Sequence, residues 1–316
     1  METLPEHPLI EITSEDIRET RDCYGLNDVK RINESLDFIQ EWAQKQEHLK
    51  EALQYINRGI LERLLLLSRG SVEATKSKLD KFLTYRSMMP ELCLNRNADE
   101  FQIFSKWGAF LPLPKKCAID HTRVLVTQLL PPEQQDDFNL LTYFRYAFLL
   151  GEIKLHYDYW DSERYIVDLT HMNLGYLTKL INPIVIKKAE LLSTEAFGTK
   201  IKGIHLINAP NFVDKFVLIL KQALKPKVAG RIYIHDSYED LQKHIPKEIL
   251  PEDFGGNGPR IAKLAGMWME FIKTEEAYQI MKNTEKWVAD ESKRSSSKFN
   301  EEYLGMPGSF RKLDVD

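Results

Sequence analysis

The segment between residues 200 and 235 constrains the fold most, because it places a strongly apolar helix between two short strands. Residues 201–208 (IKGIHLIN) and 231–235 (RIYIH) have the β-branched and aromatic content of strands. Residues 211–224 (NFVDKFVLILKQAL) have large apolar side chains over far more than the ~100° stripe that a helix needs to pack on a core. The basic residues Lys200, Lys202, Lys227 and Arg231 flank this helix. An apolar helix with basic residues at its base suits a protein that opens at a membrane surface.

The residues around this segment predict an α/β fold. Residues 123–130 (RVLVTQLL) and 164–169 (RYIVDL) are strand-like, and helical patterns over 138–155 and 183–197 separate the strands. Strands that alternate with helices indicate an α/β domain with a largely parallel sheet. The turn from Pro251 to Gly258 closes this domain.

The rest of the chain is predicted to be helical. Short amphipathic helices over the first hundred residues, ended by Pro90, indicate a bundle. A helix from 261 to about 288 follows the α/β domain, and a polar tail then extends over the surface. We therefore expect an N-terminal helical domain (1–100), an α/β domain (101–258) and a C-terminal helix with its tail (259–316).

Composition excludes several classes of protein. The chain has 316 residues, of which 43% are apolar and 28% charged, so it is globular rather than disordered. A net charge of -4 does not favour binding of nucleic acid. The acidic first residues predict no signal peptide, and Cys23, Cys93 and Cys117 are far apart, as in a cytoplasmic protein with reduced thiols. No apolar run approaches the ~18–20 residues that span a bilayer, so any membrane association is expected to be peripheral and transient.

The sequence holds no constellation typical of an enzyme. It has no G-x-S-x-G nucleophile elbow, no P-loop and no H-E-x-x-H zinc motif. His235–Asp236 is the best local acid–base pair, yet a histidine at a strand end is more often structural. We expect no catalytic activity, no metal and no cofactor.

Several of these segments, in order, resemble the CRAL-TRIO (Sec14-like) lipid-transfer family. Residues 164–173, 201–228 and 244–256 are similar to its lipid-binding domain, and residues 39–49 and 61–86 to its helical N-terminal domain. The tail 290–316 is similar to insect members called tocopherol-transfer-protein-like. The resemblance implies a helical bundle followed by a lipid-binding domain with a mostly parallel sheet and a mobile gate helix, here Asn211–Leu224.

The resemblance also implies an apolar pocket between the sheet and the helices. The residues expected to bind the ligand are Phe144, Ala147, Phe148, Gly151, Ile166, Met172, Leu192, Phe197, Ile204, Phe212, Phe216, Val217 and Leu220. The tocopherol-binding member carries serines at positions that match Ala147 and Gly151. We therefore expect a drier and roomier pocket, which weakens the case for tocopherol and favours a retinoid, a carotenoid or a similar isoprenoid.

The four basic residues match the positions with which that member holds a phosphoinositide head group. The resemblance thus implies that Lys200, Lys202, Lys227 and Arg231 bind a phosphoinositide-containing membrane, each contributing ~1 kcal/mol near an anionic leaflet. A fifth basic position of the family aligns with Ser68, next to Arg69. The expected function is cytoplasmic binding and intermembrane transfer of a small hydrophobic lipid. Transfer of phosphatidylinositol or another phospholipid, and a regulatory or scaffold role without transfer, remain alternatives. Sequence leaves open the ligand, the oligomeric state and whether the gate rests open or closed.

Overall fold

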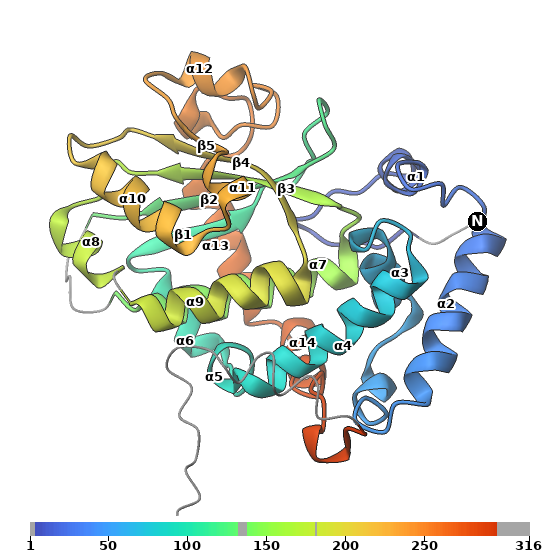
Figure 1. Ribbon diagram of the computed structural model, residues 1–316. Coiled ribbons are helices and arrows are strands. Elements are labelled where there is room, and N and C mark those ends of the chain that lie inside the picture. Colours follow the sequence, from blue (N-terminus) through green and yellow to red (C-terminus); the bar gives the residue numbers. More distant parts are fainter. Residues whose placement is uncertain (1–3, 132–137, 181, 296–316) are drawn as a thin grey trace, which may run out of the picture.

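A five-stranded sheet forms the centre of the molecule in a computed structural model that describes residues 4–131, 138–180 and 182–295 (Figure 1). Its strands lie in the order β1-β2-β3-β4-β5. They are β1 (Gly108–Pro112), β2 (Arg123–Leu129), β3 (Ser162–Asp168), β4 (Lys200–Ile207) and β5 (Ile232–Ile234). Strands β2 to β5 pair in parallel, whereas β1 pairs antiparallel with β2. The predicted parallel sheet is confirmed; the antiparallel edge strand β1 was not predicted.

The first hundred residues are helical, as expected. They form α1 (Ser14–Asp22), α2 (Val29–Gln44), α3 (Arg58–Leu67), α4 (Val72–Met88), α5 (Pro90–Cys93) and α6 (Ala98–Phe104). Short polar residues begin several of them, because a side-chain oxygen can accept a free backbone N–H of the first turn. Thr13 accepts the amide of Asp16, and Ser71 that of Ala74.

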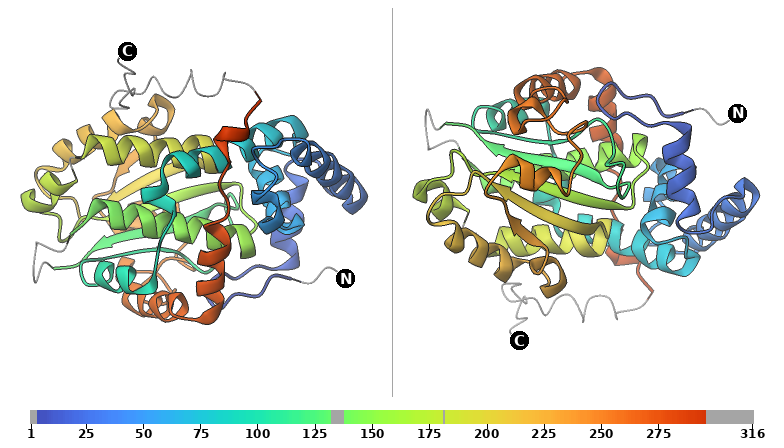
Figure 2. Two further views of the ribbon diagram at one scale, coloured as in Figure 1. Left: turned by 90° about the horizontal axis from the view of Figure 1, so that it is seen from below. Right: turned by 90° about the horizontal axis from the view of Figure 1, so that it is seen from above.

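Helices cover both faces of the sheet. Between the strands lie α7 (Leu140–Tyr157), α8 (Leu174–Lys179), α9 (Pro183–Leu191), α10 (Val213–Ala223) and α11 (Pro226–Ala229). Helix α9 continues into a π-helical turn, Leu192–Phe197. Helices α7 and α9 lie across one face of the sheet (Figure 2), and α12 (Tyr238–Gln242) lies on the opposite side (Figure 1).

The C-terminal helical segment is two helices rather than one. Helix α13 (Ile261–Ile272) ends before Thr274, whose hydroxyl accepts the amide of Ala277 and begins α14 (Glu275–Thr284). The capping threonine explains the break, since an N-cap residue leaves the helical conformation. The end of the predicted tail, residues 296–316, lies outside the described residues.

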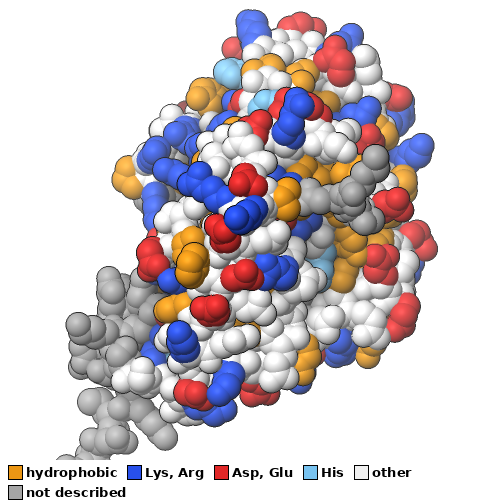
Figure 3. Space-filling view, turned by 90° about the vertical axis from the view of Figure 1, so that its right-hand side faces the viewer, with side chains coloured by type: hydrophobic (Ala, Val, Ile, Leu, Met, Phe, Trp, Pro, Cys, Tyr) orange, Lys and Arg blue, Asp and Glu red, His pale blue; other side chains and the backbone are white. Residues whose placement is uncertain are grey.

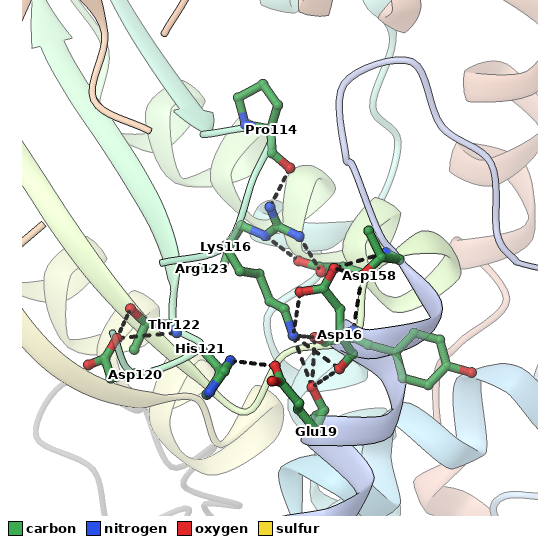
Figure 4. A network of polar contacts seen from close by, with 12 residues as sticks. Asp16, Glu19, Pro114, Lys116, Asp120, His121, Thr122, Arg123 and Asp158 are labelled. Carbon is green, nitrogen blue, oxygen red and sulfur yellow. Dashed lines mark hydrogen bonds and ion pairs between the residues drawn. The ribbon is translucent and has the colours of Figure 1, made fainter. Parts of the chain in front are cut away.

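Helix α7 separates two hydrophobic cores. Leu149 and Ile153 face a core formed with the sheet and the C-terminal helices, whereas Phe148 and Leu155 face a core formed with the N-terminal helices. Polar contacts also join the N-terminal segment to the sheet (Figure 4). Lys116, between β1 and β2, lies 3.4 Å from the Asp16 carboxylate of α1, and Arg123 of β2 lies 2.7 Å from Asp158 at the end of α7.

Candidate functional site

An apolar cavity of about 310 Å³ lies between the sheet and the helices α7, α9 and α10. Helix α7 contributes Phe144 and Ala147, the sheet contributes Val167 and Ile204, and α10 contributes Phe216. The volume is at the small end of the range for small-molecule pockets, which is ~300–1,000 Å³. A cavity of this size suits one single-chain apolar molecule better than a lipid with two acyl chains.

Nine of the expected ligand-binding residues lie on the cavity wall. The structure brings together Phe144, Ala147, Phe148, Gly151, Met172, Phe197, Ile204, Phe216 and Leu220. On α10, the lining residues 216, 219 and 220 follow the helical period, and Leu224, which caps the helix, also lines the cavity, so this helix turns one side to the cavity.

The other four expected residues are not part of the wall. Ile166 is buried on the far face of β3, because its neighbours Tyr165 and Val167 line the cavity and strand side chains alternate between faces. Leu192 is buried in the core of the N-terminal helices. Phe212 and Val217 are half-buried and pack at the edge of the sheet core.

The absence of a side chain at Gly151 does not enlarge the cavity. A Cβ atom at Gly151 would stand 3.0 Å from the ring of Phe197, which fills the space. Phe197 also stacks on Phe148, with ring centroids 5.9 Å apart. At Gly151, the loss of a hydroxyl therefore leaves an apolar wall without enlarging the cavity.

Sequence reasoning missed polar side chains on the same wall. The hydroxyls of Thr127 and Tyr143 lie 3.1 Å apart, and Lys154 pairs with Glu163, which also accepts the Tyr165 hydroxyl. Burial raises the pKa of the Tyr143 phenol to about 12, and burial together with the Glu163 carboxylate raises that of Tyr165, so both stay protonated. Periodicity could have predicted these residues on the cavity wall, because Lys154 follows Gly151 by three residues on α7 and Tyr165 alternates with Ile166 on β3.

Helix α10 forms a lightly held wall of the cavity. Phe216 is buried, but Leu218 is 58% exposed, although it is apolar. Within the described part of the chain, no side-chain hydrogen bond or ion pair joins α10 to another element. Among the described residues, this helix is held against its neighbours by apolar contact.

The four basic residues lie at the end of the sheet where β4 and β5 begin. Lys200 and Lys202 are on β4, Lys227 is on α11, and Arg231 precedes β5 and donates to the Ile201 carbonyl. Figure 3 shows Lys and Arg side chains gathered on one part of the surface, with Asp and Glu among them.

Two aspartates that sequence reasoning missed lie beside these lysines. Lys202 Nζ is 3.5 Å from the Asp120 carboxylate, and Lys200 Nζ is 3.9 Å from Asp161. Burial raises the pKa of Asp120, but its bonds to Thr122 and Arg164 and the charge of Lys202 outweigh burial and lower the pKa to about 2. An ionised Asp120 therefore neutralises part of the basic cluster.

The segment aligned with the fifth basic position lies in a small hollow. Ser68 ends α3 in a buried position, and Arg69 follows with φ of 58°. Lys78 and Lys81 line the same hollow. Glu195 accepts from both Lys81 and Lys225, so the hollow adjoins the segment that leads into α11.

The histidine considered for acid–base chemistry belongs to a stacked group on the opposite face of the sheet. His235 Nε2 lies 2.9 Å from His205 Nδ1, and both rings lie near His244. Burial lowers the pKa of His205 to about 3, so its ring is neutral at pH 7. Across residues 4–131, 138–180 and 182–295, no acidic, histidine or cysteine side chains are grouped as metal ligands. No helix in this part of the chain is both long and apolar enough to cross a bilayer.

Comparison with known proteins finds two domain models and several relatives that match parts of this chain. Residues 120–256 match the CRAL/TRIO domain model, and residues 28–103 match that of the Pinta-like UBA domain. Alpha-tocopherol transfer protein-like of Mus musculus is 33% identical over 75 residues, which cover 23% of this chain and 22% of the relative. Clavesin-1 of Rattus norvegicus is 30% identical over 95 residues, covering 30% and 27%. The chain thus spans about a fifth to a quarter of the length of these relatives. The crystal structure of Sfh5 aligns with 85% of this chain and 100% of its own, at 13% identity and a TM-score of 0.45.

Proposed function

We propose that this protein binds one small hydrophobic lipid in its cavity and transfers it between membranes, since residues 120–256 match the CRAL/TRIO domain model. The observation that carries the proposal is the apolar cavity with α10 as one wall, a helix without polar ties to its neighbours in the described residues. The relatives named for tocopherol transfer agree with it. We propose that the protein is cytoplasmic, acts without catalysis and meets membranes only transiently.

Burial of apolar surface explains both retention and the need for a membrane. A ligand that hides ~500 Å² of apolar surface gains ~12 kcal/mol at most, before the costs of association. The same free energy makes release into water slow. Discharge therefore requires an apolar acceptor, and we propose that α10 moves aside as the gate when the protein meets a bilayer.

We also propose that Lys200, Lys202, Lys227 and Arg231 direct this contact to phosphoinositides. Their common position at one end of the sheet supports the proposal, since a cluster of cations favours a multiply charged phosphate. Asp120 and Asp161 reduce the field of the two β4 lysines. A single phosphate charge is then weakly attracted, and a head group with several phosphates is favoured.

Mass spectrometry of the lipid extracted from the purified protein tests the ligand. We expect a single isoprenoid or a similar small lipid. A diacyl phospholipid would instead indicate phospholipid transfer, and an extract without lipid would indicate a regulatory or scaffold protein with an unused pocket.

Vesicle binding tests the membrane contact. The protein should bind vesicles that contain phosphatidylinositol bisphosphate more tightly than plain phosphatidylcholine vesicles, and the double variant Lys200→Glu/Lys227→Glu should lose the difference. Lys30→Glu/Lys50→Glu, with the same change of charge at or near α2, is the matched control. Equal loss in both variants would show a general charge effect and contradict the proposed site.

A further inference from the structure

Three polar side chains lie together at one end of the mainly apolar cavity. Lys154 comes from the last turn of α7, and Glu163 and Tyr165 come from the cavity side of β3. The Lys154 ammonium pairs with the Glu163 carboxylate, whose other oxygen accepts the Tyr165 hydroxyl at 2.5 Å. The ring of Trp160 lies under the ammonium, 4.1 Å from Nζ to the ring centroid.

Stability alone does not account for this group, which we name the polar end. The side chain of Lys154 is 1% exposed and that of Glu163 7%. Removing two charges from water costs several kcal/mol each, and well-packed apolar side chains often stabilise a fold as well or better. An ion pair in the wall of an apolar cavity therefore points to something that the cavity holds.

The polar end keeps unused hydrogen-bonding capacity. Lys154 has three N–H donors, of which Glu163 accepts one and the Trp160 ring faces the ammonium. The Tyr165 hydroxyl donates a hydrogen bond to Glu163, and its oxygen retains its lone pairs as acceptors. A group that both accepts and donates a hydrogen bond matches what remains.

The charges on the wall select against an anion. Among the described residues that line the cavity, Lys154 is the only Lys or Arg, whereas Glu163, Asp168 and Glu190 are acidic. Lys154 is already neutralised by Glu163, and Lys187 pairs with Glu190 at 3.0 Å. Asp168 has no paired cation among the described residues, so a ligand carboxylate would meet net negative charge in a poorly solvated place. A neutral head group meets no such repulsion.

Resting on the proposed function, we propose that the polar end binds the hydroxyl of a neutral lipid alcohol. The apolar tail of the ligand then runs along α7 past Gly151, Phe148 and Ala147 toward Tyr143. Positions 154 and 143 are eleven residues apart, which corresponds to ~16 Å along the helix. This length suits an extended isoprenoid or a single acyl chain with one polar end.

A competition experiment tests the choice of head group. The full chain is equilibrated with phosphatidylcholine vesicles that contain equal amounts of all-trans-retinol and all-trans-retinoic acid, re-isolated by gel filtration, and its bound lipid quantified by mass spectrometry. A second set of vesicles contains 1-hexadecanol and palmitic acid. We expect at least tenfold more alcohol than acid on the wild-type protein in at least one pair.

Glu163→Gln should invert this preference, because it leaves the Lys154 cation without its counter-charge while the side chain keeps its shape. If that variant does not fold, Lys154→Met/Glu163→Met removes both charges and should retain lipid but lose the selection between alcohol and acid. Glu73→Gln, which removes the charge of an exposed glutamate paired with Lys76 outside the cavity, is the control and should keep the preference for alcohol.

The outcomes separate this inference from the proposed function. Bound lipid without preference in the wild-type protein, or an unchanged preference in Glu163→Gln, would overturn the role of the polar end and leave lipid binding intact. No uptake of any of the four probes would count against both.

Discussion

Helices α7 and α10 both border the cavity, yet they are held by different forces. The side of α7 away from the cavity carries Glu152, which is fully buried and pairs with both Arg86 and Arg96. Arg86 also donates to the carbonyls of Thr284 and Trp287, so this network joins α7 to α4 and to the C-terminal segment. Helix α10 has apolar contacts alone within the described residues.

The difference shows which wall can move. Apolar contacts have no preferred direction, so α10 can exchange the cavity for the interior of a bilayer without leaving a polar group unpaired. A shift of α7 would separate buried charges at a cost of several kcal/mol. The comparison therefore predicts a fixed wall at α7 and a mobile one at α10.

The largest expected effect comes from breaking the fixed wall. Glu152→Ala leaves two arginines buried without their counter-charge, and we expect the free energy of unfolding to fall by about 3–5 kcal/mol. Chemical denaturation followed by circular dichroism measures it. Glu270→Ala, which removes the exposed partner of Lys273, should cost less than about 1 kcal/mol. Similar losses of unfolding free energy in both variants would mean that the buried network stabilises the protein no more than an exposed ion pair does.

A smaller effect is expected in the mobile wall, and on transfer rather than on stability. Leu218→Glu places a charge on the exposed apolar side of α10 and removes a burial term of about 1.5–3 kcal/mol at the membrane. We expect lipid transfer between vesicles to slow about tenfold or more, with unfolding almost unchanged. Ile103→Glu, at a half-exposed apolar position on α6, is the control. A normal transfer rate in Leu218→Glu would exclude α10 as the membrane-contacting gate.

The smallest expected effect is the contribution of one histidine of the fixed wall to the pH dependence of stability. Burial lowers the pKa of His156 to about 4, and its ring stacks on Trp287 beside the arginine network. The unfolded chain, with a histidine pKa near 6.5, binds more protons between pH 6.5 and 4, so stability falls as the pH is lowered through this window. By pH 5 the loss from this residue is about 1–2 kcal/mol.

Denaturation curves at pH 7 and pH 5 measure the effect of His156. His156→Phe should show a weaker pH dependence than the wild-type protein, although His7 and His205, whose pKa values burial also lowers, retain part of it. His171→Phe, at a half-buried position in the turn after β3, is the comparison variant. An identical pH dependence in His156→Phe and the wild-type protein would disprove the assignment.

The sequence predicted those features that depend on local periodicity. The parallel strands, α7 and the helix at 213–223 follow from periods of two and 3.6 residues, which need no knowledge of distant contacts. Ile166 was assigned to the cavity because resemblance aligned its position, whereas the alternation along β3 places Tyr165 and Val167 there instead.

Features that join distant segments could not be predicted in this way. Glu152 and its partners Arg86 and Arg96 are 66 and 56 residues apart, and nothing in their local patterns pairs them. The polar end forms because the helical period of α7 and the alternation along β3 bring Lys154 together with Glu163 and Tyr165. Phe197 fills the space beside Gly151 from the π-helical turn that follows α9, which no local pattern indicates.

Phe197 also links the shape of the cavity to the N-terminal helices. Its ring meets Phe82 of α4 edge-on, with centroids 5.1 Å apart, and its carbonyl accepts from Lys78 of the same helix. Gly198 follows with φ of 65°, and a Cβ there would stand 1.8 Å from the Lys78 ammonium. A chimera that combined residues 120–256 with the N-terminal helices of another protein would therefore have a cavity of different shape, even with every lining residue unchanged.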